Sequence, residues 1–126
     1  MISIVIPSLN KLPYTRRCLD SLLLTTGAEF EFVIVDNGST DGTAEYLLDF
    51  RRRTAAAGIP TTVLFNDRNV GACTARNQAI GLCRGSEIAF LDNDIVLRDR
   101  RWLAVLREAL YSDDRIAMVT PKLLFP

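Results

Sequence analysis

Residues 30–42 have the sequence FEFVIVDNGSTDG. The first part, Phe30–Val35, is apolar and β-branched apart from one glutamate, a composition typical of a buried strand. Asp36–Gly42 follows directly and is rich in turn and helix-capping residues, so a helix capped by Ser39, Thr40 or Asp41 is expected next. That helix should end near Gly58-Ile59-Pro60 and turn three residues toward the core: Ala44, Leu47 and Leu48. A strand, a polar loop and a helix in this order form the repeating unit of an α/β fold.

The same unit recurs along the chain. Strands are predicted at Ile2–Pro7, Phe30–Val35, Thr61–Phe65, Glu87–Leu91 and Ile116–Val119. Apolar residues recur at helical spacing after Pro13, after Gly71 and within Asp99–Tyr111. The residues expected to face the core are Tyr14, Cys18, Leu19, Leu22, Leu23, Ala72, Ala75, Ala79, Ile80, Cys83, Leu103, Leu106 and Leu110. Strands that alternate with helices predict right-handed crossovers and an α/β fold, with a mostly parallel sheet covered by helices on both faces.

The composition indicates one domain and excludes some classes of partner. The chain has 126 residues, 48% of them apolar and 24% charged, and its 15 basic residues balance its 15 acidic ones. A neutral chain has no long-range field that attracts nucleic acid, so no nucleic-acid partner is expected. No apolar run approaches the roughly 18 residues of a spanning helix, and no basic leader opens the sequence, so we expect a cytoplasmic protein without a membrane span.

Rare and absent side chains limit the possible chemistry. The three cysteines, Cys18, Cys73 and Cys83, lack C-x-x-C spacing and are interpreted as small core residues. Histidine does not occur, which excludes a Ser-His-Asp triad, a Cys-His pair and a histidine-bound metal within this chain. Any reaction must therefore use carboxylates, amides, hydroxyls and arginine.

Polar segments follow four of the predicted strands. They are Pro7-Ser8-Leu9-Asn10, Asp36-Asn37-Gly38-Ser39, Arg68-Asn69-Val70-Gly71 and Asp92-Asn93-Asp94. Ligands of open parallel sheets bind outside the carboxyl ends of the strands. The four segments are therefore expected to meet at one edge of the sheet and to form one pocket.

Asp92 and Asp94 place two carboxylates at the end of a hydrophobic strand. Desolvation of both charges is costly unless a cation compensates for it. Mn²⁺ or Mg²⁺ prefers oxygen ligands and completes its shell with water and substrate phosphate oxygens, so the pair predicts a metal site and a diphosphate ligand. The simpler interpretation is that both aspartates only cap the next turn.

Asp36 and Asn37 stand at the tip of the second strand, where a carboxylate or an amide can bond the edge of a base. Gly38 lets the backbone turn away behind them. Arg68 and Arg76 are candidates to offset diphosphate charge, although arginines in loops and on helices are more often only solvated. The other arginine clusters, Arg51 to Arg53 and Arg98 to Arg101, are assigned to solvated helix faces.

Taken in order, these segments resemble the sequence blocks of family 2 glycosyltransferases. The resemblance covers residues 3–10, residues 33–43, Asn69-Val70-Gly71 with Ala75-Arg76-Asn77, and Phe90-Leu91-Asp92-Asn93-Asp94. Four blocks in the family's order are more specific than any one of them. The resemblance implies a Rossmann-like GT-A fold of the nucleotide-diphospho-sugar transferases. It also implies an enzyme that transfers a sugar with inversion from a nucleoside-diphosphate sugar.

The resemblance assigns roles by position. Pro7, Ser8 and Leu9 would line the base pocket, and Asp36 and Asn37 would contact base or ribose. Asp92 would lie near the ribose and donor sugar, and Asp94 would be the principal ligand of Mn²⁺ or Mg²⁺. The substrate-binding set is completed by Asn10, Asn69, Gly71, Arg76 and Asn93. Many members carry a second aspartate where this chain has Asn37. An amide both donates and accepts hydrogen bonds, whereas an ionised carboxylate only accepts. The resemblance therefore does not decide whether the nucleotide is UDP, GDP or dTDP.

An inverting transfer also needs a base that deprotonates the acceptor hydroxyl, and the family draws it from well beyond the D-x-D block. Asp113-Asp114 is interpreted as a turn before the fifth strand and not as that base. Residues 1–126 are therefore expected to be the nucleotide-sugar-binding N-terminal part of a longer enzyme, inactive alone. The acceptor would be a saccharide or a lipid-linked molecule, and the full-length protein is a candidate for a peripheral place at the inner face of the membrane.

Three other functions compete with this one. A nucleotidyltransferase needs a glycine-rich loop after the first strand, but no glycine precedes Gly27. A phosphatase of the haloacid dehalogenase type carries its Asp-x-Asp nucleophile after the first strand, whereas here the motif follows the fourth. The remaining alternative is a non-catalytic module that only binds the nucleotide sugar, which the sequence does not reject.

Overall fold

The computed structural model describes residues 1–122 and 124. Within them the elements alternate along the chain, in the order β1 (Ile2–Ser8), α1 (Leu12–Leu22), β2 (Phe30–Asp36), α2 (Thr43–Ala56), β3 (Thr61–Phe65), α3 (Ala72–Ile80), β4 (Glu87–Phe90) and α4 (Trp102–Leu110). The strands lie in the order β3-β2-β1-β4, and all three pairings are parallel. The predicted α/β fold with a parallel sheet is confirmed.

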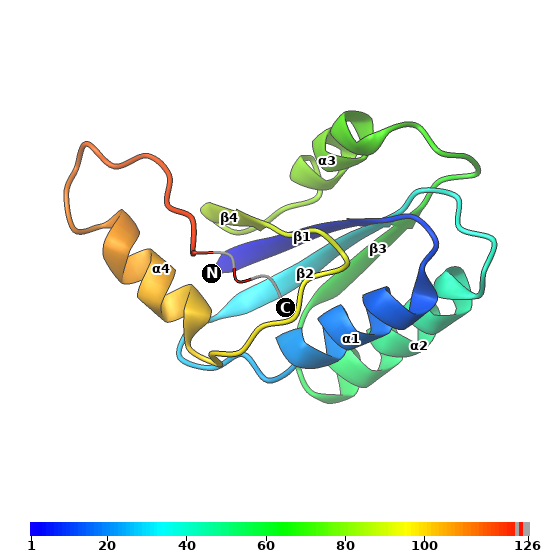
Figure 1. Cartoon of the computed structure of the whole chain (residues 1–126), viewed down its shortest axis with the longest axis horizontal. Helices are drawn as coiled ribbons and strands as arrows, with labels where there is room; N and C mark the ends of the chain where they lie inside the picture. The colour runs from blue at the N-terminus through cyan, green and yellow to red at the C-terminus, as the bar shows by residue number, and fades with distance from the viewer. Residues whose placement is uncertain (123, 125–126) are drawn as a thin grey trace.

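Helices cover both faces of the sheet, as Figure 1 shows with α1 and α2 below it and α3 above it. Alternate residues of each strand point to opposite faces. Ile4 of β1 and Phe32 of β2 belong to the larger core, which they share with α1, α2 and α4. Val5 and Val33 belong to a smaller core closed by Ala75 and Ala79 of α3. None of the helices in the described part of the chain is long and apolar enough to span a membrane.

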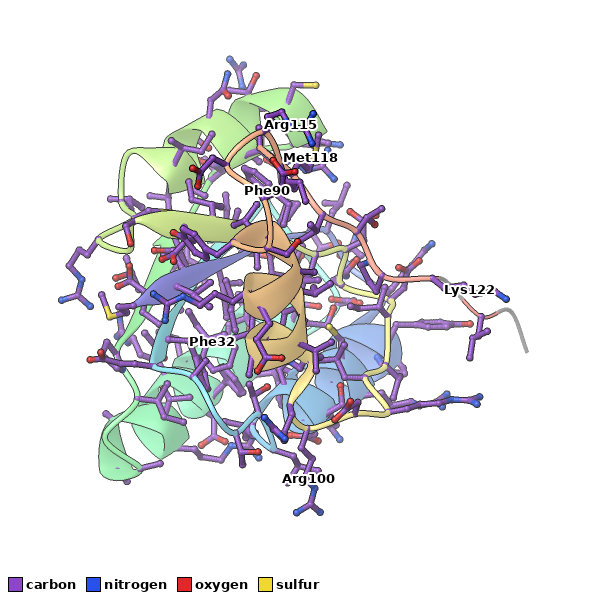
Figure 2. The ribbon with its side chains drawn as sticks, turned by 90° about the vertical axis from the view of Figure 1, so that its left-hand side faces the viewer. Phe32, Phe90, Arg100, Arg115, Met118 and Lys122 are labelled. Atoms are coloured by element: carbon purple, nitrogen blue, oxygen red, sulfur yellow. The ribbon has the colours of Figure 1, made fainter. Side chains whose placement is uncertain are left out.

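The helix α4 packs at the amino end of the sheet, next to the N-terminus of the chain (Figures 1 and 2). Its residues Trp102 and Leu103 are buried in the larger core. The indole Nε1 of Trp102 donates a hydrogen bond of 3.0 Å to Thr25 Oγ1, which satisfies the polar atom of this buried ring. The long segment between β4 and α4 therefore returns the chain from the carboxyl end of the sheet to its amino end.

A buried carboxylate ties the α3–β4 loop to this amino end. Glu31 of β2 is 0% exposed, and its carboxylate accepts hydrogen bonds from Ser3 Oγ (2.7 Å), Arg84 N (2.6 Å) and Arg84 Nε (2.8 Å). Burial raises the pKa of Glu31, but these bonds and the guanidinium charge outweigh burial and leave the pKa below its usual value. Gly85 lies so close to β1 that an added Cβ would be 2.7 Å from Ser3 N. These contacts fix where β4 begins.

One predicted strand is wrong: residues 116–120 have no regular structure. Ile116 and Val119 are half-buried, while Met118 is 83% exposed, so the segment lies on the surface beside β4 without joining the sheet. Figure 2 shows Met118, Arg115 and Phe90 on one side of the molecule. A β-branched sequence favours a strand only where a neighbouring strand offers paired backbone groups, and none does so here within the described residues.

The assignment of helix faces was also partly wrong. The residues predicted to face the core but found exposed are Tyr14, Leu48, Ala72, Cys73 and Ile80. Each helix meets the sheet along a narrow stripe, so that only Leu47 and Phe50 of α2 and only Ala75 and Ala79 of α3 are buried apolar residues. The fourth helix begins at Trp102 and not at Asp99, whose carboxylate bonds Arg101 N outside the helix (2.8 Å).

Candidate donor site at the carboxyl edge of the sheet

The four polar segments lie at the same edge of the sheet, as predicted. Ser8 pairs with Asp36, and Asp36 pairs with Phe65, so β1, β2 and β3 end level with one another. Val5 pairs with Phe90, and the same register continued by two residues brings Asp92 level with Pro7. Asn37 N donates to Ser8 O (2.8 Å), which extends the pairing into the first loop residue.

The loop after β1 is fastened to the loop after β2. Asn10 and Lys11 both adopt left-handed backbone conformations, with φ of 54° and 57°, which non-glycine residues seldom adopt. Asn10 N donates to Ser39 Oγ (2.8 Å), and Thr40 N donates to Asn10 Oδ1 (2.8 Å). These two bonds hold the unusual backbone, so Asn10 joins the two loops at the rim of the predicted base pocket.

Asp36 presents a buried carboxylate at the tip of β2, with a relative exposure of 2%. Both of its oxygens are used by Ser39: the hydroxyl donates to Oδ1 (2.5 Å) and the backbone N–H donates to Oδ2 (3.3 Å). The carboxylate is therefore held in one orientation. None of the predicted cap residues occupies the N-cap position of α2, which is Gly42; Asp41 precedes it, and its Oδ1 accepts from Thr43 N (3.1 Å).

Asn37 faces into the protein. Its Oδ1 accepts hydrogen bonds from Val70 N (3.0 Å) and Asn66 Nδ2 (3.2 Å), and its Nδ2 donates to Asn69 Oδ1 (2.8 Å). The backbones of Gly38 and Arg68 also touch, since a Cβ added to Gly38 would lie 2.8 Å from Arg68 Cα. The loop between β3 and α3 is therefore seated on Asn37 and Gly38.

The middle residue of the D-x-D segment also faces inward. Asn93 Nδ2 donates to Thr15 Oγ1 (2.8 Å) and to Ser8 Oγ (3.4 Å), which connects the loop after β4 to α1 and to the tip of β1. Sequence analysis missed Thr15, which is fully buried on α1. The one sequence signal for it was a polar residue three positions before Cys18, on the apolar face of the helix.

The two aspartates on either side of Asn93 are exposed and differ in their contacts. Asp92 Oδ1 lies 2.8 Å from Arg76 Nη2 of α3. In residues 1–122 and 124, no hydrogen bond or ion pair engages the carboxylate of Asp94, and no three acidic, cysteine or histidine side chains converge as a metal cluster. One unpaired carboxylate beside one paired carboxylate provides oxygen ligands that fit Mg²⁺ or Mn²⁺. Such an ion takes its remaining ligands from phosphate oxygens and water.

Cys18 lies beneath these aspartates. Burial, together with the carboxylate charges of Asp94 and Asp92, raises the pKa of its thiol to about 12. Its Sγ contacts the backbone oxygen of Asp92 at 3.7 Å. The thiol therefore stays protonated at neutral pH and packs as a core residue, so it does not add a thiolate to the donor set.

Arg76 belongs to α3 and lies beside Asp92 in the loop after β4. It lines an open hollow whose other lining residues are Cys73, Asn77, Ile80, Phe90, Leu91 and Asp92. No side chain of the described residues caps α3, and Gly71 at its start has a φ of 86°. Because α3 follows the loop after β3, its amino end lies at the carboxyl edge of the sheet, where its first N–H groups favour an anion.

Known proteins with similar sequences are glycosyltransferases. The uncharacterized glycosyltransferase EpsJ of Bacillus subtilis is 30% identical over 109 residues, which are 86% of this chain and 30% of EpsJ. Chondroitin synthase of Escherichia coli is 37% identical over 94 residues, which are 75% of this chain and 13% of that protein.

Solved structures of sugar transferases share the fold. The mannosyltransferase PcManGT of Pyrobaculum calidifontis, in complex with GDP-Man and Mn²⁺, matches with a TM-score of 0.81 at 23% identity, over 90% of this chain and 32% of that one. TarS of S. aureus in complex with UDP-GlcNAc matches with a TM-score of 0.74 at 27% identity, over 89% of this chain and 32% of that one. The fold is thus the Rossmann-like GT-A fold expected from the sequence.

The chain spans between 13% and 32% of the length of these four proteins. The model of the family described as Glycosyl transferase family 2 matches residues 3–123, nearly the whole chain. With this match and the glycosyltransferase relatives, the chain belongs to glycosyl transferase family 2, a family of sugar-transferring enzymes.

Proposed function

We propose that these residues form the donor site of an inverting, metal-dependent glycosyltransferase and that they bind a nucleoside-diphosphate sugar. The observation that carries the proposal is the pair of aspartates after β4. Asp94 has an open carboxylate, and Asp92 is joined to Arg76, at the edge where the other three polar loops meet. Family membership and the two nucleotide-sugar complexes of similar fold support it.

The nucleoside is assigned to the carboxyl ends of β1 and β2. Pro7, Ser8 and Leu9 follow the end of β1, and the fixed carboxylate of Asp36 stands beside them at the tip of β2. A carboxylate held by Ser39 keeps lone pairs for an N–H of a base or a hydroxyl of a ribose. The binding experiment with UDP, GDP and dTDP distinguishes between uracil, guanine and thymine as the base that this site accepts.

The diphosphate is assigned to the space between the D-x-D loop and α3. Arg76 supplies a guanidinium there, and the uncapped amino end of α3 after Gly71 supplies N–H groups. Asn69 keeps the turn before α3 in place, because its Oδ1 accepts from Gly71 N at 2.9 Å. Positive and hydrogen-donating groups thus face the leaving group from one side.

Asp94, with Asp92, is assigned to hold Mn²⁺ or Mg²⁺. A bound divalent ion would offset the charge that develops on the departing nucleoside diphosphate. Asn93 orients the two aspartates from inside, through Thr15 and Ser8. We assign no catalytic base to any residue of this chain.

The reaction proposed for the whole enzyme is a single displacement. The hydroxyl oxygen of a saccharide or lipid-linked acceptor bonds to the anomeric carbon as the bond from that carbon to the diphosphate oxygen breaks. The hydroxyl proton passes to a base, and the nucleoside diphosphate leaves with the bonding electron pair. Attack opposite to the leaving group inverts the anomeric centre.

Calorimetry and thermal unfolding of the chain test the donor-site proposal. UDP, GDP and dTDP are titrated with and without Mn²⁺, and at least one of them should bind more tightly with Mn²⁺ and raise the melting temperature as its concentration rises. The same samples are assayed for release of sugar from UDP-GlcNAc and GDP-Man. Binding without release supports a donor site that needs further protein for catalysis. No binding of any of the three nucleotides contradicts the proposal.

A further inference from the structure

Both polar atoms of the Asn37 side chain are bonded within the protein, and only one N–H of its amide has no partner among the described residues. Asn37 is 4% exposed, its Oδ1 accepts two bonds, and its Nδ2 donates to Asn69. Asn69 Oδ1 also accepts from the backbone N–H of Gly71 (2.9 Å), the residue directly before α3. A chain of two amides thus runs from the tip of β2 to the beginning of α3.

Backbone donors fix the direction of both amides. Val70 N–H requires an oxygen at its contact with Asn37, so the nitrogen of Asn37 must face Asn69. Gly71 N–H requires an oxygen at its contact with Asn69, so that oxygen is also the one that meets Asn37. Flipping either amide would set a nitrogen against a backbone N–H, and the arrangement therefore has one solution.

Gly38 supports the same loop by close contact. Its φ is 84°, and an added Cβ would lie 2.8 Å from Arg68 Cα and 2.9 Å from Arg68 C, both backbone atoms. Gly42 provides a comparison, because its φ is 91° but an added Cβ would meet only a leucine methyl at 3.5 Å. Backbone strain is thus similar at the two glycines, whereas only Gly38 bears on the Arg68–Gly71 loop.

We propose that Asn37 is a positioning residue of the nucleotide site: with Gly38 it seats the Arg68–Gly71 loop and the start of α3, and it does not read the base. This inference rests on the proposed function. It replaces the direct contact with base or ribose that the sequence suggested for Asn37. The side chain acts on the ligand through the loop that faces the diphosphate.

In this chain, where Asn69 faces residue 37, an aspartate would not make the same contacts. Its carboxylate would still accept from Val70 N and Asn66 Nδ2, but its second oxygen would face Asn69 Oδ1, and two acceptors would oppose each other. Relief by a flip of Asn69 would break the bond to Gly71 N. Asn37→Asp should therefore displace the loop, even though the two side chains have the same shape.

The test compares affinities for UDP, GDP and dTDP in the presence of Mn²⁺, with melting temperatures measured in parallel. Asn37→Asp should weaken all the nucleotides that bind by a similar factor of about tenfold, the size expected for one hydrogen bond replaced by a repulsive contact. Gly38→Ala should weaken them in the same uniform way. Gly42→Ala, the control for backbone strain alone, should lower the melting temperature less than Gly38→Ala, which adds the clash with Arg68, and should leave the affinities unchanged.

A double-mutant cycle with Asn69→Ala separates positioning from a general loss of stability. Once the acceptor on residue 69 is removed, Asn37→Asp should cost no more than about twofold in affinity. A change in the ratio of affinities between bases upon Asn37→Asp, or additive effects in the cycle, would overturn the inference while leaving the donor site in place. Failure of the unsubstituted chain to bind any nucleotide contradicts the proposed function itself, and this inference with it.

Discussion

Arg76 Nη2 of α3 lies 2.8 Å from Asp92 Oδ1 in the loop after β4, so an ion pair joins two elements that face the same edge. Both side chains are exposed, by 36% and 66%, and pairs of this kind contribute only about 0–1 kcal/mol to stability. The pair therefore has little effect as a structural link. Its location between α3 and the D-x-D loop gives it a larger expected effect on an anionic ligand.

We predict that Arg76→Ala weakens nucleoside diphosphate binding about tenfold or more, because a charge-assisted bond contributes about 1.5–3 kcal/mol. The melting temperature should change little. Calorimetry with Mn²⁺ measures the affinity. Arg52→Ala is the matched control, since Arg52 also forms an exposed ion pair, with Asp49 at 3.3 Å, on α2. Equal losses of affinity in the two variants would contradict the role of Arg76.

Asn93 and Thr15 should affect metal-dependent binding together. Thr15→Val removes the hydroxyl that accepts from Asn93 Nδ2 and leaves the D-x-D loop itself unaltered. We expect a stability loss of about 1–3 kcal/mol from the unsatisfied amide and a weaker affinity for the nucleotide with Mn²⁺. Thr15→Ser keeps the hydroxyl and should bind nearly as tightly as the unsubstituted chain. If Thr15→Val binds with full affinity, the orientation of the aspartates does not depend on this contact.

Glu31 should make stability depend on pH. The folded state lowers the pKa of this carboxyl, so its stabilising effect is present above the ordinary pKa near 4.5 and is lost as pH falls through the lower folded value. We expect Glu31→Gln to cost about 1–3 kcal/mol at neutral pH, through loss of charged hydrogen bonds to Ser3 and Arg84. The difference from the unsubstituted chain should shrink as pH falls below 4.5.

Urea unfolding at a series of pH values measures this difference directly. Glu29→Gln is the control, because Glu29 is an exposed neighbour two residues earlier in the chain. Its unfolding free energy should follow that of the unsubstituted chain at every pH. A cost for Glu31→Gln that is the same in acid and at neutral pH would show that the carboxylate charge is not what stabilises this position.

Much of the fold was predictable because it depends on local patterns. β1 and β2 are continuous apolar strands buried on both faces, so their sequences are strongly biased, and their predicted limits differ from the observed ones by a single residue. Ile116–Val119 has a similar composition but no partner strand among the described residues. Composition indicates that a segment suits a strand, whereas pairing depends on the neighbours it meets.

The position of the candidate site was predictable for a different reason. Parallel strands that end in polar loops bring those loops to one edge whatever the details. The directions of the side chains were not predictable, because they depend on distant partners. Asn37 turns inward to Val70, 33 residues away, and Asn93 turns inward to Thr15, 78 residues away. A sequence read locally treats both amides as exposed loop residues.

The central claim, a metal-assisted nucleotide site at the carboxyl edge, is tested most directly by the Mn²⁺ dependence of nucleotide binding in Asp94→Asn. Asp114→Asn, which alters an exposed aspartate after α4, serves as the control. Calorimetry should show that Mn²⁺ tightens nucleoside diphosphate binding to the unsubstituted chain and to Asp114→Asn, and that it has almost no effect on Asp94→Asn, because the open carboxylate is gone. The same Mn²⁺ dependence in all three proteins would contradict the account.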